Sequence, residues 1–522
     1  MSVQTFKPAL MLRRKQDVPP HTIRISQILS ALSYALDLTE GRPMGHSVRS
    51  CMIGMRLAAE IGLSDSEQSD LYYALLLKDA GCSSNSSKLF HILNADEIRA
   101  KRDVKLTDWT RMGWESLQYA LKHVATGAPL VERVRTLLRV AAKQQTESCA
   151  LVKVRCERGA SIARKIGFSE GVAEAIHSLD EHWNGGGYPD GLLRGEIPML
   201  SGIMNLSQTL EVFQVNRGEQ VAIEVARKRS GRWFDPDLVR AAESLAKQGS
   251  LWTGLNQAEP DHDAAMRQVL TLEPEERRMM ASEDTIEKIC QAFAEIIDAK
   301  TPFTYQHSNG VADAATIISR QMGLSEDDVT FMRRAALVHD IGKLSVSNSI
   351  LEKPAALDKD EWDIMKKHPY YSLEILRRIP GFEDLSQVAG AHHEKLDGSG
   401  YFRHLDADQL SLEMRILTVA DIFDALAAKR PYRDALPLEK VFEIMQKEAP
   451  RAIDAECLDA LMTHHAGGRL SGGDLLGLSA HVGTGSVEIG SVDANGVETN
   501  SIDTGGGQIS SEEKNDIIIP VR

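Results

Sequence analysis

The sequence predicts an all-α protein built from two copies of one helical domain. Aromatic residues make up only 5% of the 522 residues. Ala, Leu, Ile and Met recur at spacings of three and four, which is the period of a helix face. Segments of this kind include DLYYALLLKDAG, MRRAALVHDIGK and LEMRILTVADIFDALAAK. Alternating patterns typical of strands are hard to find before residue 466, so we expect helices throughout the body of the chain.

An internal repeat indicates the two copies. His46 opens HSVRSCMIGMRLAAEIGLS, and Asp79 follows 33 residues later. In the same way, His307 opens HSNGVADAATIISRQMGLS, and Asp340 follows 33 residues later. Further along, the segment HWNGGGYPDGL in the first copy corresponds to HEKLDGSGYFRHL in the second. Several matches in the same order and at similar spacing are far from chance.

The repeat divides the chain into four parts. We expect a first domain over residues 20–250, a linker over 251–284, a second domain over 285–465 and a tail over 466–522. Pro274 lies near a helix start and is followed by helix-forming residues, which favours a long helix connecting the two domains. The tail is acidic and rich in Gly and Ser, so it cannot bury much apolar surface and is expected to be disordered.

Composition excludes several classes of protein. The chain has 60 Lys and Arg against 74 Asp and Glu, a formal net charge of −14, which argues against a protein that coats nucleic acid. It has no apolar stretch of about 18 residues, so no membrane-spanning helix is expected. The N-terminal segment lacks the apolar region of a secretory signal. The six cysteines form no CxxC pair, and we expect reduced thiols in a cytoplasmic protein.

The second copy concentrates residues that bind transition metals. Its histidines and aspartates lie in otherwise apolar helical segments, where isolated charges are costly, and they are the ligand types of Zn, Mn and Fe. Adjacent residues on a helix point about 100° apart, so a His-Asp or His-His pair can serve two neighbouring ions. Seven candidates exceed the roughly four ligands of one tetrahedral ion, which favours two ions. The candidates are His307, His339, Asp340, His368, His392, His393 and Asp421.

Two adjacent ions suit the hydrolysis of a phosphoester. Such a pair lowers the pKa of a shared water and holds the attacking and leaving oxygens of a phosphoryl displacement. Lys343 projects from the same helix face as the paired aspartate three residues earlier. Arg430 and Arg433 follow Asp421 and offer guanidinium groups that suit phosphate. Asp424 shares a helix face with Asp421 and could contact Lys343 or a metal-bound histidine.

The motifs VHDIGK, HHEKLDGSGY and ADIFDALAAKRPYR occur in this order over roughly residues 285–465. They resemble the HD-GYP domain family, a branch of the HD phosphohydrolases that hydrolyses cyclic dinucleotides, chiefly cyclic di-GMP. The resemblance implies a helical bundle with a metal centre, often of iron or manganese, held by the seven candidates with Asp340 as the bridge.

The same resemblance assigns roles to residues outside the ligand set. It implies that Lys343 faces the scissile phosphate and that Arg430 and Arg433 hold the phosphates of the ligand. Gly400 and Tyr401 correspond to the loop that names the family, which lies beside the substrate.

Three positions depart from the family pattern. Phe402 stands where the family has proline, which frees the backbone and adds a ring, so substrate preference is the property it most affects. Phe303 occupies the position at which some members carry a glutamate for a third metal. Thr301 replaces an aspartate that family members frequently carry in the same segment, just before His307. We therefore expect two divalent ions, Fe or Mn.

The first copy lacks most of the predicted metal ligands, although it keeps the loop Gly187-Tyr188-Pro189. An ammonium and a guanidinium stand where ligands belong, which opposes a bound cation. We therefore expect a regulatory or dimerisation domain without a metal, and binding of a nucleotide phosphate by its basic residues is the alternative. The replacements are Lys78, Arg155, Leu179, Asp180 and Gln208.

The leading hypothesis is a phosphodiesterase that opens cyclic di-GMP to pGpG and further to GMP. Asp340 would hold the ions, and Lys343 and the two arginines would hold phosphate. One alternative is a cyclic-dinucleotide sensor with little turnover that acts through a partner such as a diguanylate cyclase. Another is a phosphodiesterase for a different cyclic dinucleotide such as cyclic GMP-AMP. The connecting helix makes a homodimer plausible, and neither nucleic acid nor a membrane is an expected partner.

Overall fold

The structure is a computed structural model, and residues 1–461 form one compact unit while residues 462–522 form a second. Both copies of the repeat lie in the first unit. The residues described are 11–12, 22–108, 114–126, 128–255, 262–304, 306–428 and 435–470.

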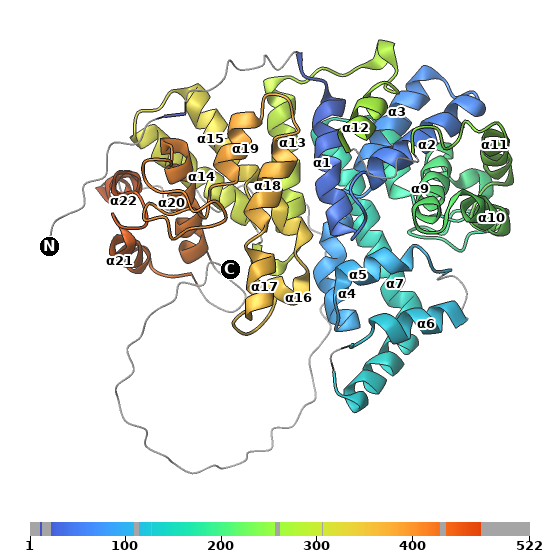
Figure 1. The fold of residues 1–522 in the computed structure, drawn as a ribbon, viewed down its shortest axis with the longest axis horizontal. Helices are drawn as coiled ribbons and strands as arrows, with labels where there is room; N and C mark the ends of the chain where they lie inside the picture. Colours follow the sequence, from blue (N-terminus) through green and yellow to red (C-terminus); the bar gives the residue numbers. More distant parts are fainter. Residues whose placement is uncertain are drawn as a thin grey trace. The chain divides into compact units, whose positions relative to one another are not determined.

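Helices make up the regular structure of these residues, which confirms the predicted all-α class (Figure 1). Many of them begin at a serine whose side chain accepts a hydrogen bond from a backbone N–H group of the first turn. Ser64 accepts from Glu67, and Ser325 accepts from Asp328 in the second copy. Serine is a preferred residue at this position because those N–H groups have no partner inside the helix. In the described ranges, β-structure is limited to isolated bridges.

The first half packs α2, α3 and α9 against one another. Ile53 and Leu57 of α2 and Leu75 of α3 are fully buried. The elements are α1 (Ile25–Thr39), α2 (His46–Glu60), α3 (Asp65–Leu77), η2 (Cys82–Asn85), α4 (Ser86–Leu93), α5 (Glu97–Val104), α6 (Trp114–His123), α7 (Leu130–Ile166), α8 (Glu170–His177), η3 (Arg194–Glu196), α9 (Met199–Arg217), α10 (Glu219–Arg229), α11 (Pro236–Lys247), α12 (His262–Leu270) and η4 (Glu275–Arg277).

The second half repeats this packing, with α14, α15 and α20 in the places of α2, α3 and α9. Short turns between the helices carry several of the predicted site residues. The elements are α13 (Glu283–Asp298), η5 (Pro302–Thr304), α14 (His307–Gln321), α15 (Glu326–Val338), η6 (Ile341–Ser345), α16 (Asn348–Leu351), α17 (Lys359–Met365), α18 (His368–Leu376), α19 (Glu383–Ala389), α20 (Leu412–Ala427), α21 (Leu438–Glu448) and α22 (Ala455–Leu470).

The connecting helix of the sequence prediction is α13, which contacts α7 of the first half and α14 and α15 of the second. It starts at Glu283, where Ser282 accepts a hydrogen bond from the N–H group of Thr285. The residues after Pro274 form only the single turn η4. The helix is therefore shorter than the sequence pattern suggests, because the serine cap rather than the proline marks its start.

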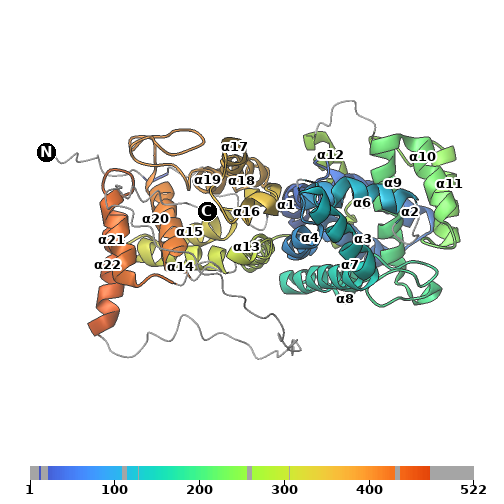
Figure 2. The same cartoon turned by 90° about the horizontal axis from the view of Figure 1, so that it is seen from below.

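The two halves also meet away from α13. Helix α1 packs against α18 and η6, and α4 packs against α16, which lies next to it in Figure 2.

None of the described helices is both long and apolar enough to cross a membrane. Helix α22 continues to Leu470, past the predicted domain end at residue 465. The rest of the predicted tail, residues 471–522, lies outside the described residues.

Candidate metal centre

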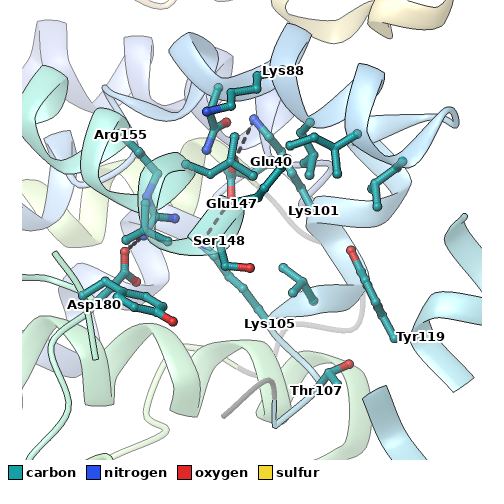
Figure 3. A pocket seen from close by; sticks show the side chains of 18 of the residues that line it. Glu40, Lys88, Lys101, Lys105, Thr107, Tyr119, Glu147, Ser148, Arg155 and Asp180 are labelled. Atoms are coloured by element: carbon teal, nitrogen blue, oxygen red, sulfur yellow. Dashed lines mark ion pairs between the residues drawn. The ribbon is translucent and has the colours of Figure 1, made fainter. Parts of the chain in front are cut away.

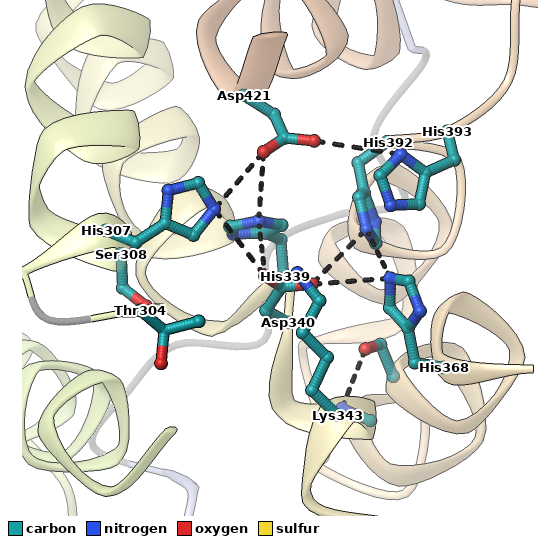
Figure 4. A network of polar contacts seen from close by, with 12 residues as sticks. Thr304, His307, Ser308, His339, Asp340, Lys343, His368, His392, His393 and Asp421 are labelled. Atoms are coloured by element: carbon teal, nitrogen blue, oxygen red, sulfur yellow. Dashed lines mark hydrogen bonds and ion pairs between the residues drawn. The ribbon is translucent and has the colours of Figure 1, made fainter. Parts of the chain in front are cut away.

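The seven predicted ligands converge at one buried place in the second half (Figure 4). His307 and His368 are the first residues of α14 and α18. His339 directly follows α15 and Asp340 directly precedes η6. The pair of histidines at 392–393 follows α19, and the remaining aspartate comes from inside α20. Helix ends turn these side chains inward, which explains why residues so far apart in sequence meet.

The ligand atoms form two groups of three that share no residue, and within each group all atoms lie within 4.8 Å of one another. Such spacing suits a shared metal ion. The first group is His307, His339 and Asp421. The second group is His368, His392 and His393. A third group, made of His339, Asp340 and His392, meets the same distance and overlaps both.

Asp340 lies between the two groups and faces each with a different oxygen. Its Oδ2 lies 3.6 Å from His307 Nε2 and 3.3 Å from His339 Nε2. Its Oδ1 lies 3.4 Å from His368 Nε2 and 3.5 Å from His392 Nε2. A carboxylate in this position can bind one ion through each oxygen. The bridging role that the family resemblance implies for Asp340 stays a prediction, and this geometry allows it.

Backbone carbonyls fix the orientation of three of the imidazole rings. The Nδ1 atoms of His339, His368 and His392 lie 2.7, 2.7 and 2.6 Å from the carbonyl oxygen three residues earlier. A carbonyl only accepts hydrogen bonds, so each Nδ1 carries the proton and each Nε2 lone pair faces the site. Metal-binding histidines are oriented in this way.

Two buried atoms of the centre lack a hydrogen-bond partner in the described part of the chain. They are Nε2 of His339 and Oδ1 of Asp340. An unsatisfied buried imidazole nitrogen and carboxylate oxygen are costly. A divalent cation would satisfy both, and it is the group that this set of nitrogen and oxygen donors fits.

The charges of the centre shift the pKa values of its groups. Burial lowers the pKa of His307, but the carboxylates of Asp421 and Asp424 outweigh burial and raise it to about 10. Burial raises the pKa of Asp340, yet the neighbouring His339 and the ammonium of Lys343 hold it well below its usual range. The carboxylates are therefore ionised and attract positive charge, whether protons on the histidines or metal ions.

Lys343 lies at the edge of the centre, with Nζ 2.5 Å from Oδ2 of Asp340. It is held by the tight packing of η6 against α18. A Cβ on Gly342 would collide with the backbone of His368, and the Gly342 N–H group donates to the Ser372 hydroxyl at 3.0 Å. Glycine at this position is what allows the two segments to approach so closely.

Asp424 contacts His307 rather than Lys343, with Oδ2 2.6 Å from the Nδ1 atom of the imidazole. This is one of the two contacts that the sequence left open. Sequence reasoning missed Gly310, one turn into α14, where a Cβ would collide with the Asp424 carboxylate. It also missed Asp298, which accepts a 2.7 Å hydrogen bond from the hydroxyl of Ser308.

The loop predicted to lie beside the substrate packs against the centre. The Tyr401 ring lies 4.9 Å from the ring of His393, measured between centroids. Gly400 has no room for a Cβ because the backbone of residues 393–395 is too close. The Phe402 ring packs edge-on against Tyr370 at 5.6 Å.

Glu394 is a further residue that sequence reasoning missed. Its carboxylate accepts hydrogen bonds from the N–H groups of Arg403 and Leu405 and so holds the loop in place. Glu181 does the same in the first copy, accepting from Asp190 and Leu192. The repeat itself was the signal that could have found both glutamates.

Three of the predicted positions cannot be placed. Arg430 and Arg433 lie outside the described residues, and so does the side chain of Phe303. The other predicted site residues of the second half are all at or beside the cluster.

The equivalent place in the first half carries fixed cations. Lys78 contacts Asp79, and Arg155 contacts Asp180. Gln208 accepts a hydrogen bond from Lys105 at 3.4 Å. Three residues of metal-binding types still meet here, because side-chain atoms of Glu40, Asp79 and Cys82 lie within 4.8 Å of one another. The ammonium groups of Lys101 and Lys105 lie beside the carboxylates of Glu40 and Asp79, which opposes a bound cation. The absence of a metal from the first half stays a prediction.

Comparisons with known proteins identify the family of the chain. The sequence profile of the HD domain matches residues 132–238 and 291–457, in both halves. The 3'3'-cGAMP-specific phosphodiesterase 3 of Vibrio cholerae serotype O1 is 42% identical over 444 residues, which cover 85% of this chain and 95% of that protein. The 3'3'-cGAMP-specific phosphodiesterase 1 of the same organism is 35% identical over 244 residues, covering 47% of this chain and 56% of that protein.

Two further comparisons extend the picture. The cyclic di-GMP phosphodiesterase response regulator RpfG of Xanthomonas campestris is 32% identical over 220 residues, covering 41% of this chain and 57% of that protein. A crystal structure of a cyclic GMP-AMP specific phosphodiesterase of V. cholerae (V-cGAP3) is similar with a TM-score of 0.58 and 38% identity. It covers 85% of this chain and 98% of that one. With a profile match in both halves and a relative aligned over nearly its whole length, this chain belongs to the HD domain family, as its resemblance to the HD-GYP branch predicts.

Proposed function

We propose that the chain is a metal-dependent phosphodiesterase that hydrolyses a cyclic dinucleotide, with 3′3′-cGAMP as the preferred substrate. One observation carries the activity: Asp340 presents one oxygen to His307 and His339 and the other to His368 and His392. The spacing supports two divalent ions, and the mixture of imidazole and carboxylate supports Fe or Mn.

The substrate preference differs from the cyclic di-GMP that the sequence alone favours. The relatives that are 42% and 35% identical are named as specific for 3'3'-cGAMP. The cyclic di-GMP phosphodiesterase RpfG is 32% identical and aligns over a smaller share of the chain. These comparisons support the alternative substrate, cyclic GMP-AMP, over the leading one.

Bound ions would supply an activated water and neutralise charge on the phosphate. The side chains of the protein do the rest. Asp340 lies between the two ligand groups and would fix the distance between the two ions. Lys343 lies on the Oδ2 side of this carboxylate, where its ammonium would neutralise a non-bridging phosphate oxygen. The water oxygen joins phosphorus, the bond to the 3′ oxygen breaks, and that oxygen takes up a proton. The product is a linear dinucleotide with a 5′-phosphate.

The Gly400-Tyr401-Phe402 loop would hold the nucleotide. The hydroxyl of Tyr401 is buried and has no hydrogen-bond partner in the described ranges, so it is available to a ligand. Phe402 and Tyr370 offer two neighbouring rings on which a base could stack. This loop would therefore be the part of the site that reads the bases.

The test is turnover of the two substrates side by side. The full chain is purified anaerobically, its metal content is measured, and it is incubated separately with 3′3′-cGAMP and cyclic di-GMP before chromatography of the products. We expect about two ions per chain and faster cleavage of 3′3′-cGAMP. Faster cleavage of cyclic di-GMP would refute the substrate preference. Metal without cleavage of either would support the sensor alternative.

A further inference from the structure

A cavity lies in the first half of the chain, around the place where lysine and arginine replace the predicted metal ligands (Figure 3). Its volume is about 1650 Å³, which exceeds the 300–1,000 Å³ of most small-molecule sites. Side chains of α4, α5, α6, α7 and α9 line it, together with residues that follow α13. The cavity is thus large enough for a nucleotide.

The walls of the cavity carry more positive than negative charge, although the whole chain has a net charge of −14. Lys88 and Arg139 are exposed, and neither has an ion-pair partner among the residues that the structure describes. The basic residues are Lys88, Lys101, Lys105, Arg139, Arg155 and Arg232. The acidic residues are Glu40, Glu147, Asp180 and Asp298.

Lys105 divides its charge among several neighbours. Its Nζ lies 3.5 Å from Glu40, 3.6 Å from Asp79 and 3.4 Å from Gln208. None of these distances is that of a short ion pair. A phosphate entering the cavity could therefore draw this ammonium toward itself without breaking a strong contact.

Planar side chains form another part of the lining. The Trp233 ring is buried and already covered, because His182 stacks on it with 4.1 Å between centroids and the guanidinium of Arg229 lies 4.0 Å from its centroid. Tyr119 and Tyr188 lie elsewhere in the wall. The rings that would meet a base are therefore those of Tyr119 and Tyr188 rather than that of Trp233. Rings suit the face of a base, and cations suit phosphate. Together they favour a nucleotide over an inorganic anion.

Helix α5 links this cavity to the catalytic half. Lys101 and Lys105 follow Glu97 at steps of four residues and so lie on one side of the helix. Glu97 is fully buried, and its carboxylate accepts from the Ser347 hydroxyl at 2.8 Å and from the Asn348 N–H group at 3.0 Å. Only Val346 separates these two residues from η6, which carries Lys343.

A second link runs through the opposite wall. Asp298 lines the cavity and also holds the hydroxyl of Ser308, the neighbour of the predicted ligand His307. Two walls of the cavity are thus bonded to segments that position the metal centre.

From these observations we infer that the cavity of the first half is a regulatory site for a phosphate-bearing nucleotide. Lys88, Lys105 and Arg139 meet its phosphates, and the aromatic wall meets its base. Binding draws α5 toward the phosphate, and Glu97 passes that shift to the turn before α16. The proposal of a binding site does not depend on the proposed phosphodiesterase activity, whereas the proposal of a regulatory effect does.

Binding is tested first, without turnover. Full-length chain carrying Asp340→Asn is titrated calorimetrically with GTP, 3′3′-cGAMP and cyclic di-GMP, and with inorganic phosphate for comparison. We expect at least one nucleotide to bind, and to bind at least about tenfold more tightly than phosphate. Adding Lys88→Ala and Arg139→Ala should weaken that binding event at least about tenfold. Both residues are exposed, so the fold should tolerate their loss.

Lys228→Ala is the matched control, because Lys228 is an exposed lysine of α10 outside the cavity. It should leave nucleotide binding unchanged. Binding that is equal with and without Lys88 and Arg139, or no binding by any of the three nucleotides, would overturn the proposed site.

Regulation is tested with the active chain and the nucleotide that binds in the titration. That nucleotide should change the rate of substrate hydrolysis at least about twofold. The Lys88→Ala, Arg139→Ala chain should hydrolyse substrate normally but lose this response, and Glu97→Gln should lose it while still binding. A response that persists in both variants would refute the coupling. Absence of any hydrolysis would instead count against the phosphodiesterase, leaving the binding result intact.

Discussion

Arg155 and His368 occupy equivalent places in the two halves of the chain. The carbonyl oxygen of Arg155 lies where a Cβ on Gly81 would be, and that of His368 lies where a Cβ on Gly342 would be. A guanidinium stays protonated and has no lone pair for a metal, whereas the imidazole has one. The same helix crossing therefore holds a fixed cation in one half and a predicted metal ligand in the other.

This equivalence predicts where metal binds. His368→Ala should lower the metal content from about two ions per chain to one or fewer, because it removes a ligand of the second group. Arg155→Ala is the control and should leave the metal content unchanged. Metal analysis after gel filtration measures both. Loss of metal from the Arg155 variant would place an ion in the first half, against this account.

The hydrogen bond from His307 to Asp424 predicts weaker metal retention when its charge is removed. Asp424→Asn should lower the metal affinity about 10- to 100-fold, the usual effect of losing a carboxylate behind a metal-bound histidine. Titration with a competing chelator measures the affinity. Glu211 contacts His46 in the same way in the first half, so Glu211→Gln should not change metal affinity. Equal affinities for wild type and Asp424→Asn would show that this contact does not support the centre.

The close approach of η6 to α18 predicts a large cost for a single methyl group. Gly342→Ala should destabilise the fold by about 3 kcal/mol or more, because the new Cβ meets backbone rather than a movable side chain. Metal should be lost as well, since Asp340 would be displaced. Gly195→Ala is the control, because nothing lies within 4 Å of its Cβ position. Thermal unfolding of the two variants should therefore differ clearly, and similar melting temperatures would contradict the packing described.

Lys300 predicts a rise of stability with pH. Burial, partly offset by Glu97, lowers the pKa of its ammonium from 10.5 to about 8. Between these values the unfolded chain binds the proton and the folded chain does not, so stability increases as the pH rises from about 8 to 10.5. The gain is roughly 3 kcal/mol. Lys300→Met should abolish this part of the pH dependence in urea unfolding, and an identical pH profile for both chains would refute it.

Phe402 predicts part of the substrate preference. Phe402→Leu removes the ring that packs on Tyr370 and should lower the ratio of kcat/KM for 3′3′-cGAMP to that for cyclic di-GMP by about tenfold. Metal content should not change. Phe402→Pro tests the backbone as well as the ring. If neither substitution changes the ratio, the bases are read elsewhere.

The residues of the centre could be predicted because the repeat and the His and Asp motifs are local in sequence. Their grouping could not. Whether His392 shares an ion with His368 or with His339 depends on the direction in which the turn after α19 aims its side chains. Gly310 is needed only because Asp424, more than a hundred residues later, approaches it. Contacts of this kind are set by helix packing, which the periodic pattern of one helix does not specify.

The connecting segment is a place where the sequence pattern predicts the wrong start of a helix. Pro274 and the helix-forming residues after it favour a helix that starts early, but Ser282 caps it later. The cavity of the first half was beyond prediction because α4, α5 and α6 lie between η2 and α7, where the second copy has only the short helices α16 and α17 between η6 and α18. The repeat gives no guide to a segment that differs between the copies, so only the structure places Lys88 and Lys105 opposite α7 and α9.

The central claim is that the two ligand groups joined by Asp340 form the catalytic centre for a cyclic dinucleotide. The most direct measurement compares the hydrolysis of 3′3′-cGAMP by wild-type and Asp340→Asn chains, each with its metal content determined. We predict a linear product from the wild type, and at least about a thousandfold less from the variant together with loss of most metal. Full turnover by Asp340→Asn would contradict the claim.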